Sequence, residues 1–457
     1  MMILNATKGI ATASLALASS LVFAAAGEFD PSFNRVGFTR ELIGNGSAGI
    51  GLAIHFTDEI VTGGYYVDSA NAANPVLWRH LADGSPDTRF GGTGIVYPAP
   101  PPGFISGNNG MFSAAIDNQD RIVLLMLTVL PYSHVFYRFN FDGVPDSSFS
   151  ETGRVIFPIF YGYPILDVTI QPDNKIVAVG AARNAASNHY EFLVYRLLES
   201  GELDPSFGGT GRIWTPITPG GGDDRSTGVA IQGDGKIVVG GRAKSDADAN
   251  YNFALARYST TGELDSDFGR GGTVVFPILD DNIGRKLVIQ PDGKILMAGY
   301  TCEEIAGGDE YCYFGVARVD ELGLLDPGFG GTGKVFTDVG NGFAVDLALQ
   351  SDNKIVAVGN HQLGANLDYN NNILVRYLTD GALDSTFGVN GISETNYGYR
   401  YSSGADVRIQ SDGKIVVAGA TGRGIGSGRA VTARYLSDSG GFAGRLVGSM
   451  PALRIER

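Results

Sequence analysis

The sequence contains few charged residues, few histidines and almost no cysteine. Of its 457 residues, 18% are Asp, Glu, Lys or Arg, five are histidine and two are cysteine. None of the histidines recurs at a fixed interval, so a histidine-based metal or catalytic site is not expected. After residue 26, no apolar run approaches the roughly 20 residues that a bilayer requires, and we expect no membrane span in the mature chain.

Glycine and hydrophobic residues are plentiful. The 66 glycines argue against long helices and favour short strands joined by tight turns, while a hydrophobic content of 44% argues against disorder. Acidic residues outnumber basic ones by 48 to 34, a net charge of −14. Such a surface repels phosphate backbones, so nucleic acid is not an expected partner.

Residues 1–26 have the pattern of a targeting signal. One basic residue, Lys8, precedes an apolar run over residues 10–23, and the small residues Ala24 to Ala26 follow it. This pattern predicts a signal peptide cleaved after Ala26, and hence a secreted or periplasmic protein. An uncleaved anchor is the alternative, but the run is short for a bilayer and contains Ser and Thr.

Three motifs recur seven times along the rest of the chain, at intervals close to 60 residues. The first is typified by "QPDGKILMAG", and its shared isoleucine stands at Ile60, Ile122, Ile176, Ile237, Ile295, Ile355 and Ile415. The second is an arginine near the end of an apolar strand, and the third is an Asp-x-x-Phe motif followed in most copies by glycine. Three registers that agree on seven units make chance similarity untenable.

Each unit reads as four strands, as in "GRIWTPI", "GVAIQ", "KIVVGG" and "FALARY" of the fourth. The Asp-Gly or Asp-Asn pair between the second and third of these strands suits a two-residue type I′ hairpin. A period near 60 with four strands predicts an all-β, seven-bladed β-propeller with four antiparallel strands per blade over residues 27–442. Residues 443–457 form a tail or an extra strand, and we expect a monomer.

The phrases "LDPSFGGTGRI", "IQPDGKILMAG" and "FALARY" resemble the bacterial delta-60 repeat, specifically in the third to seventh units and more loosely in the first two. The resemblance covers nearly all of residues 27–442. It implies a repeat propeller of exported bacterial proteins, and it implies no particular activity.

The repeated arginine and aspartate are predicted to pair within each unit. In six units the aspartate follows the arginine by eight residues, and the last arginine and the first aspartate lack such a partner, so they should pair and close the ring. The predicted structural pairs are Arg79 with Asp87, Arg138 with Asp146, Arg196 with Asp204, Arg257 with Asp265, Arg318 with Asp326, Arg376 with Asp384, and Arg434 with Asp30. An arginine on an apolar strand needs such a partner. A ring of arginines that binds anions is the alternative.

Cys302 and Cys312 bracket the insertion "CEEIAGGDEYC" of the fifth unit and predict a disulfide in an exported chain, with free thiols as the alternative. No cofactor is expected. The run Asp246, Asp248 and Asn250 has the spacing that opens a calcium loop, but it lacks the glycine and the glutamate that complete one, so a solvated acidic loop is favoured.

In a four-stranded antiparallel blade, the connection between the first two strands and the connection between the last two lie on the same face. The irregular segments of the units are all connections of these two kinds, so they lie on one face of the propeller. This loop face carries "YPAPPPGFISGNNG", "TPITPGGGDDRST" and "ETNYGYRYSSG", whereas the opposite turn face carries the monotonous Asp-Gly-Lys turns. Loops on a rigid scaffold commonly bind, and tyrosine supplies a large amphipathic contact area. The predicted binding residues are Tyr161, Tyr163, Tyr251, Tyr311, Tyr397, Tyr399 and Tyr401.

Two functions follow from this pattern. The first is a non-enzymatic binding or structural module that holds a glycan, peptide or protein of the envelope or the exterior on the loop face. The second is a hydrolase or lyase that uses carboxylates such as Asp223, Asp224, Asp280 and Asp281 at the mouth of the propeller. Three or more carboxylates that meet near the ring axis would favour the enzyme.

Overall fold

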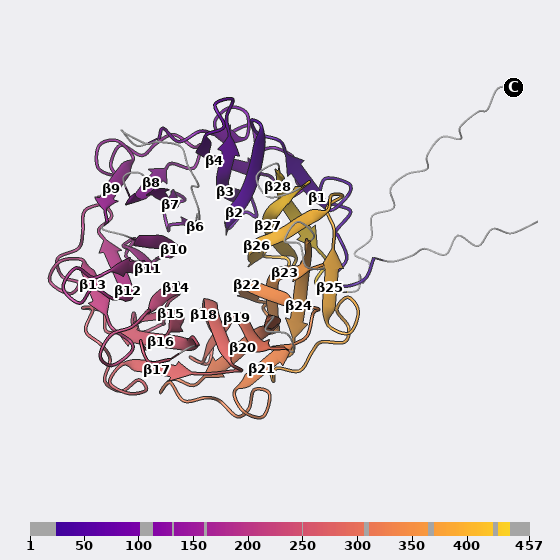
Figure 1. The fold of residues 1–457 in the computed structure, drawn as a ribbon. Helices are drawn as coiled ribbons and strands as arrows, with labels where there is room; N and C mark the ends of the chain where they lie inside the picture. The colour runs from indigo at the N-terminus through magenta and orange to yellow at the C-terminus, as the bar shows by residue number, and fades with distance from the viewer. Residues whose placement is uncertain are drawn as a thin grey trace, which may run out of the picture.

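The strands of the chain form a ring of small antiparallel sheets, with the first strand of each sheet nearest the ring axis (Figure 1). The computed structural model describes residues 24–100, 113–129, 132–159, 162–248, 250–305, 310–363, 370–423 and 428–438. Among these residues, no helix is long and apolar enough to cross a membrane. The fold is an all-β propeller with four antiparallel strands per blade.

Five blades have four strands each, in chain order from the axis outwards. They are β2 (Gly46–Ile54), β3 (Ile60–Val67), β4 (Ala73–His80) and β5 (Ile95–Val96); β6 (Ser113–Ile116), β7 (Ile122–Val129), β8 (Tyr132–Phe139) and β9 (Arg154–Pro158); β10 (Gly162–Ile170), β11 (Ile176–Arg183), β12 (Tyr190–Leu197) and β13 (Arg212–Thr215); β14 (Arg225–Ile231), β15 (Ile237–Ala243), β16 (Asn252–Tyr258) and β17 (Thr273–Phe276); and β18 (Asp281–Ile289), β19 (Ile295–Glu304), β20 (Glu310–Val319) and β21 (Lys334–Thr337).

The prediction of seven blades is wrong, because the structure has five such blades and one larger sheet. The eight remaining strands form a single sheet, and they are β22 (Gly342–Leu349), β23 (Ile355–Gln362), β24 (Asn370–Tyr377), β25 (Ile392–Thr395), β26 (Tyr401–Ile409), β27 (Ile415–Gly422), β28 (Gly428–Tyr435) and β1 (Phe38–Glu41). A parallel pairing of Asn370 with Tyr401 joins β24 to β26. The sixth and seventh sequence units therefore share one sheet.

Two local expectations also need correction. The first strand of each sequence unit lies in the preceding sheet; Arg212–Thr215, for example, pairs with β12 and not with β14. The hairpins at Asp-Gly are not two-residue loops: the amide of Gly293 donates to the carbonyl of Gln290 at 2.9 Å, and the φ of Gly293 is 83° while that of Asp292 is not positive. This is the three-residue loop that ends in a left-handed residue.

The N-terminal segment closes the ring. Strand β1 pairs antiparallel with β28, in the register Phe38 with Ala433, and the amide of Asp30 donates to the carbonyl of Arg434 at 2.9 Å. The predicted closure through the N-terminus is confirmed. In a ring, this pairing covers an outer edge that the last sheet would otherwise leave bare.

Apolar side chains of neighbouring sheets pack against each other to form the core. Val179 and Val194 of one blade lie in the same buried cluster as Val239 and Ala256 of the next. Strand β15 is buried over most of its length on both sides, which explains why its sequence does not alternate between apolar and polar residues.

Candidate functional site

Each of the seven repeated arginines contacts the aspartate predicted for it. The distance from arginine Nε to aspartate Oδ2 lies between 2.7 and 2.9 Å in every pair. The guanidinium also lies 4.5 to 4.9 Å from the ring centroid of the Phe of the same Asp-x-x-Phe motif. These arginines are 1 to 6% exposed, so they are structural groups and not an anion-binding ring.

The same arginines also join successive units. In each case Nη1 donates to a backbone carbonyl of the next unit, as Arg196 does to Thr260 and Arg376 does to Ser437. In five units a lysine of the hairpin adds a second cation to the aspartate, at 3.0 to 3.5 Å: Lys175, Lys236, Lys294, Lys354 and Lys414. The sequence predicts these lysines only as residues of the Asp-Gly-Lys turns, so their contact with the aspartate was not predicted.

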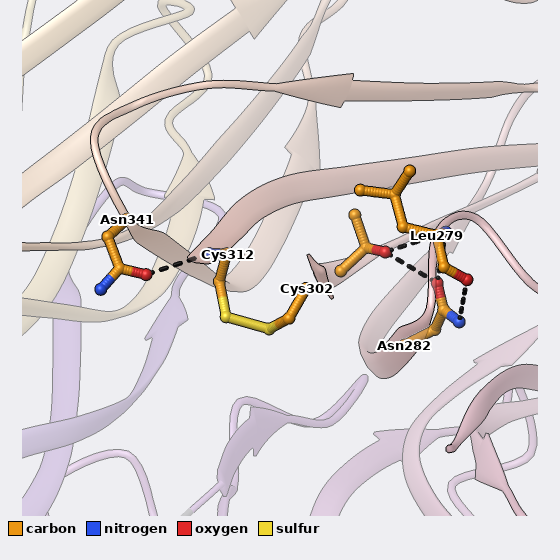
Figure 2. Close-up of a disulfide and its surroundings, with 6 residues drawn as sticks. Leu279, Asn282, Cys302, Cys312 and Asn341 are labelled. Carbon is orange, nitrogen blue, oxygen red and sulfur yellow. Dashed lines mark hydrogen bonds between the residues drawn. A yellow bond between two sulfur atoms is a disulfide. The ribbon is translucent and has the colours of Figure 1, made fainter. Parts of the chain in front are cut away.

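The predicted disulfide between Cys302 and Cys312 is confirmed (Figure 2). The two residues are cross-strand partners in β19 and β20, and the amide of Cys312 donates to Oδ1 of Asn341 at 3.0 Å. The bridge fixes the base of the loop that follows β19 on the loop face.

The predicted binding tyrosines are dispersed over the ring. Tyr251 precedes β16, the hydroxyl of Tyr311 donates to Asp338 at 2.9 Å, and Tyr399 lines an open hollow with Arg400 and Arg423. Tyr401 begins β26 and is partly buried. Tyr163 belongs to β10, but its side chain and all of Tyr161 lie outside the described residues.

Tyr397 does not lie on the surface, contrary to the prediction. Its side chain is 0% exposed, and its ring packs against Phe29 and Phe38 of the closing N-terminal segment. Its hydroxyl lies 3.0 Å from that of Tyr435. Tyr397 is therefore a core residue of the ring closure.

Three arginines lie over three tyrosines on consecutive blades, and we call these six residues the arginine–tyrosine row. The guanidinium carbon of Arg225 lies 5.1 Å from the ring centroid of Tyr190, that of Arg242 lies 4.6 Å from Tyr251, and that of Arg285 lies 5.5 Å from Tyr300. All six residues are partly buried. They belong to the blades that begin with β10, β14 and β18, which are neighbours in the ring (Figure 1); five of them lie in strands, and Tyr251 directly precedes β16.

Asp223 anchors the centre of the arginine–tyrosine row. Its two oxygens lie 2.5 Å from Nε and Nη2 of Arg225, and the hydroxyl of Tyr251 donates to Oδ2 at 2.6 Å. Burial would raise the pKa of Asp223, but the bonds from Arg225 and Tyr251 hold that pKa below its usual value. Burial and the bond to Asp223 raise the pKa of Tyr251 to about 12. The carboxylate and the phenol therefore keep their charge states at neutral pH.

Tyr251 was predicted as a binding residue from the sequence, whereas the arginines of the row were not. When the units are aligned on their shared isoleucine, the position of Arg242 holds Tyr65, Ala181, Asn360 and Ala420 in other units. An arginine occurs at this position only once. A search for residues that depart from the repeat would have found it, whereas a search for repeated residues selects structural groups.

The carboxylates predicted at the mouth do not form a catalytic pair. Asp224 is 0% exposed and accepts the amides of Ile217 and Thr218, at 2.7 and 3.0 Å. An oxygen of Asp281 accepts the amide of Tyr251 at 2.7 Å, and Asp280 is exposed. In the acidic run considered for calcium, Asp248 accepts the hydroxyl of Ser245 at 2.6 Å.

Three carboxylates do meet on the inner strands, in an axial network with two cations. Lys286 of β18 contacts Asp167 of β10, and Nη1 of Arg408 lies 3.0 Å from Asp346 of β22 and 2.5 Å from Asp406 of β26. Each carboxylate also accepts an amide of an adjacent sequence unit, from Val229, Val407 and Leu52 respectively. The three carboxylate side chains are 2 to 6% exposed, so the network joins the inner strands and offers no free catalytic acid.

The axial network makes stability depend on pH through Asp406. Burial raises the pKa of Asp406 well above its usual value, and the Asp346 carboxylate raises it further. The unfolded chain releases this proton near pH 3.9, so between that pH and the folded pKa the stability from Asp406 falls by up to about 1.4 kcal/mol per pH unit. We expect Asp406→Asn to gain stability relative to the wild type as the pH rises from about 4 to 6. Urea unfolding at several pH values checks this, and a constant difference between the two proteins would contradict it.

The comparisons with known proteins agree with the fold. A family model described as a domain of unknown function (DUF5122) beta-propeller matches residues 58–90, 171–207, 232–268, 350–387 and 410–439. No curated protein matches the sequence. The chain is a β-propeller repeat protein.

The solved structures found by comparison include polysaccharide lyases and the extracellular domains of a semaphorin. Polysaccharide lyase Uly1 is 12% identical over 86% of this chain and 90% of its own, with a TM-score of 0.51. An ulvan lyase of family PL25 bound to -[GlcA(1-4)Rha3S]- is 11% identical over 88% and 96%, with a TM-score of 0.45, and Drosophila semaphorin 1a, domains 1–2, is 8% identical over 87% of both chains, with a TM-score of 0.43. At 12% identity, the similarity to Uly1 shows the fold alone.

Proposed function

We propose that this β-propeller repeat protein is an exported binding protein that holds a glycan on its loop face, at the arginine–tyrosine row. The observation that carries the proposal is the set of three arginine-on-tyrosine contacts at 4.6 to 5.5 Å on consecutive blades. Guanidinium groups present planar pairs of donors that suit the spaced oxygens of a sugar, and the tyrosines add amphipathic ring surface.

The placement of the row supports this function over catalysis. Its single carboxylate, Asp223, is held by Arg225 and Tyr251, and the carboxylates of the axial network are buried in ion pairs. A hydrolase of the usual two-carboxylate type needs a pair of acids on either side of the substrate. Among the described residues, the row brings no second carboxylate of this kind into contact with its arginines.

Export is part of the proposal. The disulfide between Cys302 and Cys312 suits an oxidising compartment, as does the predicted signal peptide over residues 1–26. The proposal takes the repeats to be delta-60 repeats, which their motifs resemble. Cleavage after Ala26 would remove one contact of the ring closure, the bond from the amide of Gly388 to the carbonyl of Ala26 at 2.8 Å.

A glycan and peptide array tests the proposed function. We expect the full chain to bind one or more glycans, and the double variant Tyr251→Ala, Tyr300→Ala to bind them at least about tenfold more weakly, because buried aromatic anchors dominate such contacts. The matched control is Phe56→Ala, which removes an aromatic ring that is 76% exposed in a hairpin of the turn face and should leave binding unchanged.

Three outcomes would contradict the proposal. They are binding to peptides alone, equal binding by the tyrosine double variant, and loss of binding in the Phe56→Ala control. Incubation of each bound glycan with the protein, followed by a count of new reducing ends, separates binding from cleavage. Cleavage at the row would replace the binding function by the enzymatic alternative.

A further inference from the structure

The arginine–tyrosine row contains two arginines that face each other directly. Arg225 and Arg242 are cross-strand partners in β14 and β15. Like charges in this position destabilise a sheet. Asp223 neutralises one of them through two bonds to Arg225, and its Oδ2 also accepts the Tyr251 hydroxyl. The arrangement leaves positive charge on the β15 side of the pair.

Arg242 and Arg285 carry that positive charge without a partner. Among the residues that the structure describes, neither guanidinium has a hydrogen bond or an ion pair, and the Nε of each is buried with no acceptor. Their guanidinium groups lie over the rings of Tyr251 and Tyr300. Burial and the charges of Arg225 and Arg285 lower the pKa of Arg242, but an arginine stays protonated.

The seven repeated arginines provide a contrast within the same chain. Each of them is buried and binds an aspartate, whereas Arg242 and Arg285 are partly buried and bind none. The chain has 14 more acidic than basic side chains, so acids for Arg242 and Arg285 are not scarce. Lys244 adds a further cation, 4.7 Å from the ring centroid of Tyr251. Partly buried cations that lack an acid suit a ligand that supplies the anions.

We propose that the glycan of the row is an acidic one, whose carboxylate or sulfate groups pair with the guanidinium groups of Arg242 and Arg285. This inference rests on the proposed function and names its ligand class. The two arginines come from adjacent blades, so a polymer with an acidic group on successive or alternating sugars can engage both. An anion between them also offsets the repulsion between the two guanidinium groups.

Matched acidic and neutral sugars test this inference. The probes are a galacturonic acid tetramer, its methyl ester, a sulfated galactan tetramer and the same tetramer without sulfate, each titrated calorimetrically into the full chain. We expect at least one acidic probe to bind and its neutral counterpart to bind at least about tenfold more weakly, because hydrogen bonds to charged groups are the stronger ones. Binding should also weaken as salt is raised.

Variants of the row locate the effect. The double variant Arg242→Gln, Arg285→Gln should bind the acidic probe at least about tenfold more weakly. Its thermal midpoint should not fall, because the change removes the repulsion between the guanidinium groups. The control, Arg270→Gln, makes the same type of substitution and removes one positive charge at an exposed site of the turn face, and it should leave binding unchanged. The carboxylate and sulfate probes distinguish the two sources of the anion.

Two results would overturn the inference and differ from a failure of the proposed function. If neutral and acidic partners of a pair bind equally, or if the double arginine variant keeps the affinity of the wild type, the row binds glycans but not through their acidic groups. If no glycan binds in either the array or the titrations, the proposed function itself fails, and the inference fails with it.

Discussion

Asp384→Ala is expected to lower the free energy of unfolding by about 3 to 5 kcal/mol, because it leaves a buried arginine without its acid. Arg376 is 1% exposed, and its Nε lies 2.9 Å from Asp384. The same guanidinium joins two sequence units through the carbonyl of Ser437. Chemical denaturation of the variant and the wild type measures the difference.

A double-mutant cycle serves as the control for this prediction. Arg376→Ala combined with Asp384→Ala should cost less than the sum of the single variants, since the pair disappears together. Additive losses would show that the two side chains act separately and would contradict the structural pairing.

Acid should weaken the same pair in the wild type. Burial would raise the pKa of Asp384, but the bonds from Thr386 and the charges of Arg376 and Lys354 hold it at about 2. The unfolded carboxyl ionises near pH 3.9, so the pair stabilises the fold fully above that pH and loses this contribution as the pH falls toward 2. The pH dependence of Asp406 has the opposite sign, because its contribution to stability falls as the pH rises.

Tyr397→Ala is the second large effect, with an expected loss of about 3 to 5 kcal/mol. The ring is fully buried against Phe29, Phe38 and Tyr435, so truncation leaves a cavity where the N-terminal segment closes the ring. Tyr397→Phe keeps the ring and should cost only about 1 kcal/mol for the lost hydroxyl contact.

Tyr399→Ala is the matched control, two residues away and partly exposed. It should change the stability by no more than about 0.5 kcal/mol. Thermal and denaturant unfolding of the three variants compares them directly. If Tyr397→Ala and Tyr399→Ala were equally mild, the closure through Tyr397 would be wrong.

The repeated residues were predictable because repetition reveals spacing. The eight-residue interval from Arg196 to Asp204 predicted their contact, and the unpaired Arg434 and Asp30 predicted the closure. The disulfide followed from two cysteines that bracket one insertion. Four antiparallel strands per blade also followed from the units.

Features that occur once were not predictable in this way. The pairing of Asn370 with Tyr401, which merges two units into one sheet, involves residues beside loops. The equivalent parallel pairing of Tyr190 with Asp223 is an isolated bridge that does not merge two sheets. Tyr397 stands in a loop sequence, but Phe29 and Phe38, which bury it, lie more than 350 residues away in the chain. Arg242 and Arg285 depart from the repeat, and a search for shared positions passes over them.

The most direct test of the central claim is a crystal structure of the protein with the acidic tetrasaccharide that binds best. We expect a carboxylate or sulfate group within hydrogen-bond distance of the guanidinium groups of Arg242 and Arg285, with sugar rings beside Tyr251 and Tyr300. A sugar bound instead to the turn face, or to the hollow lined by Tyr399, Arg400 and Arg423, would contradict the assignment of the binding site to the arginine–tyrosine row.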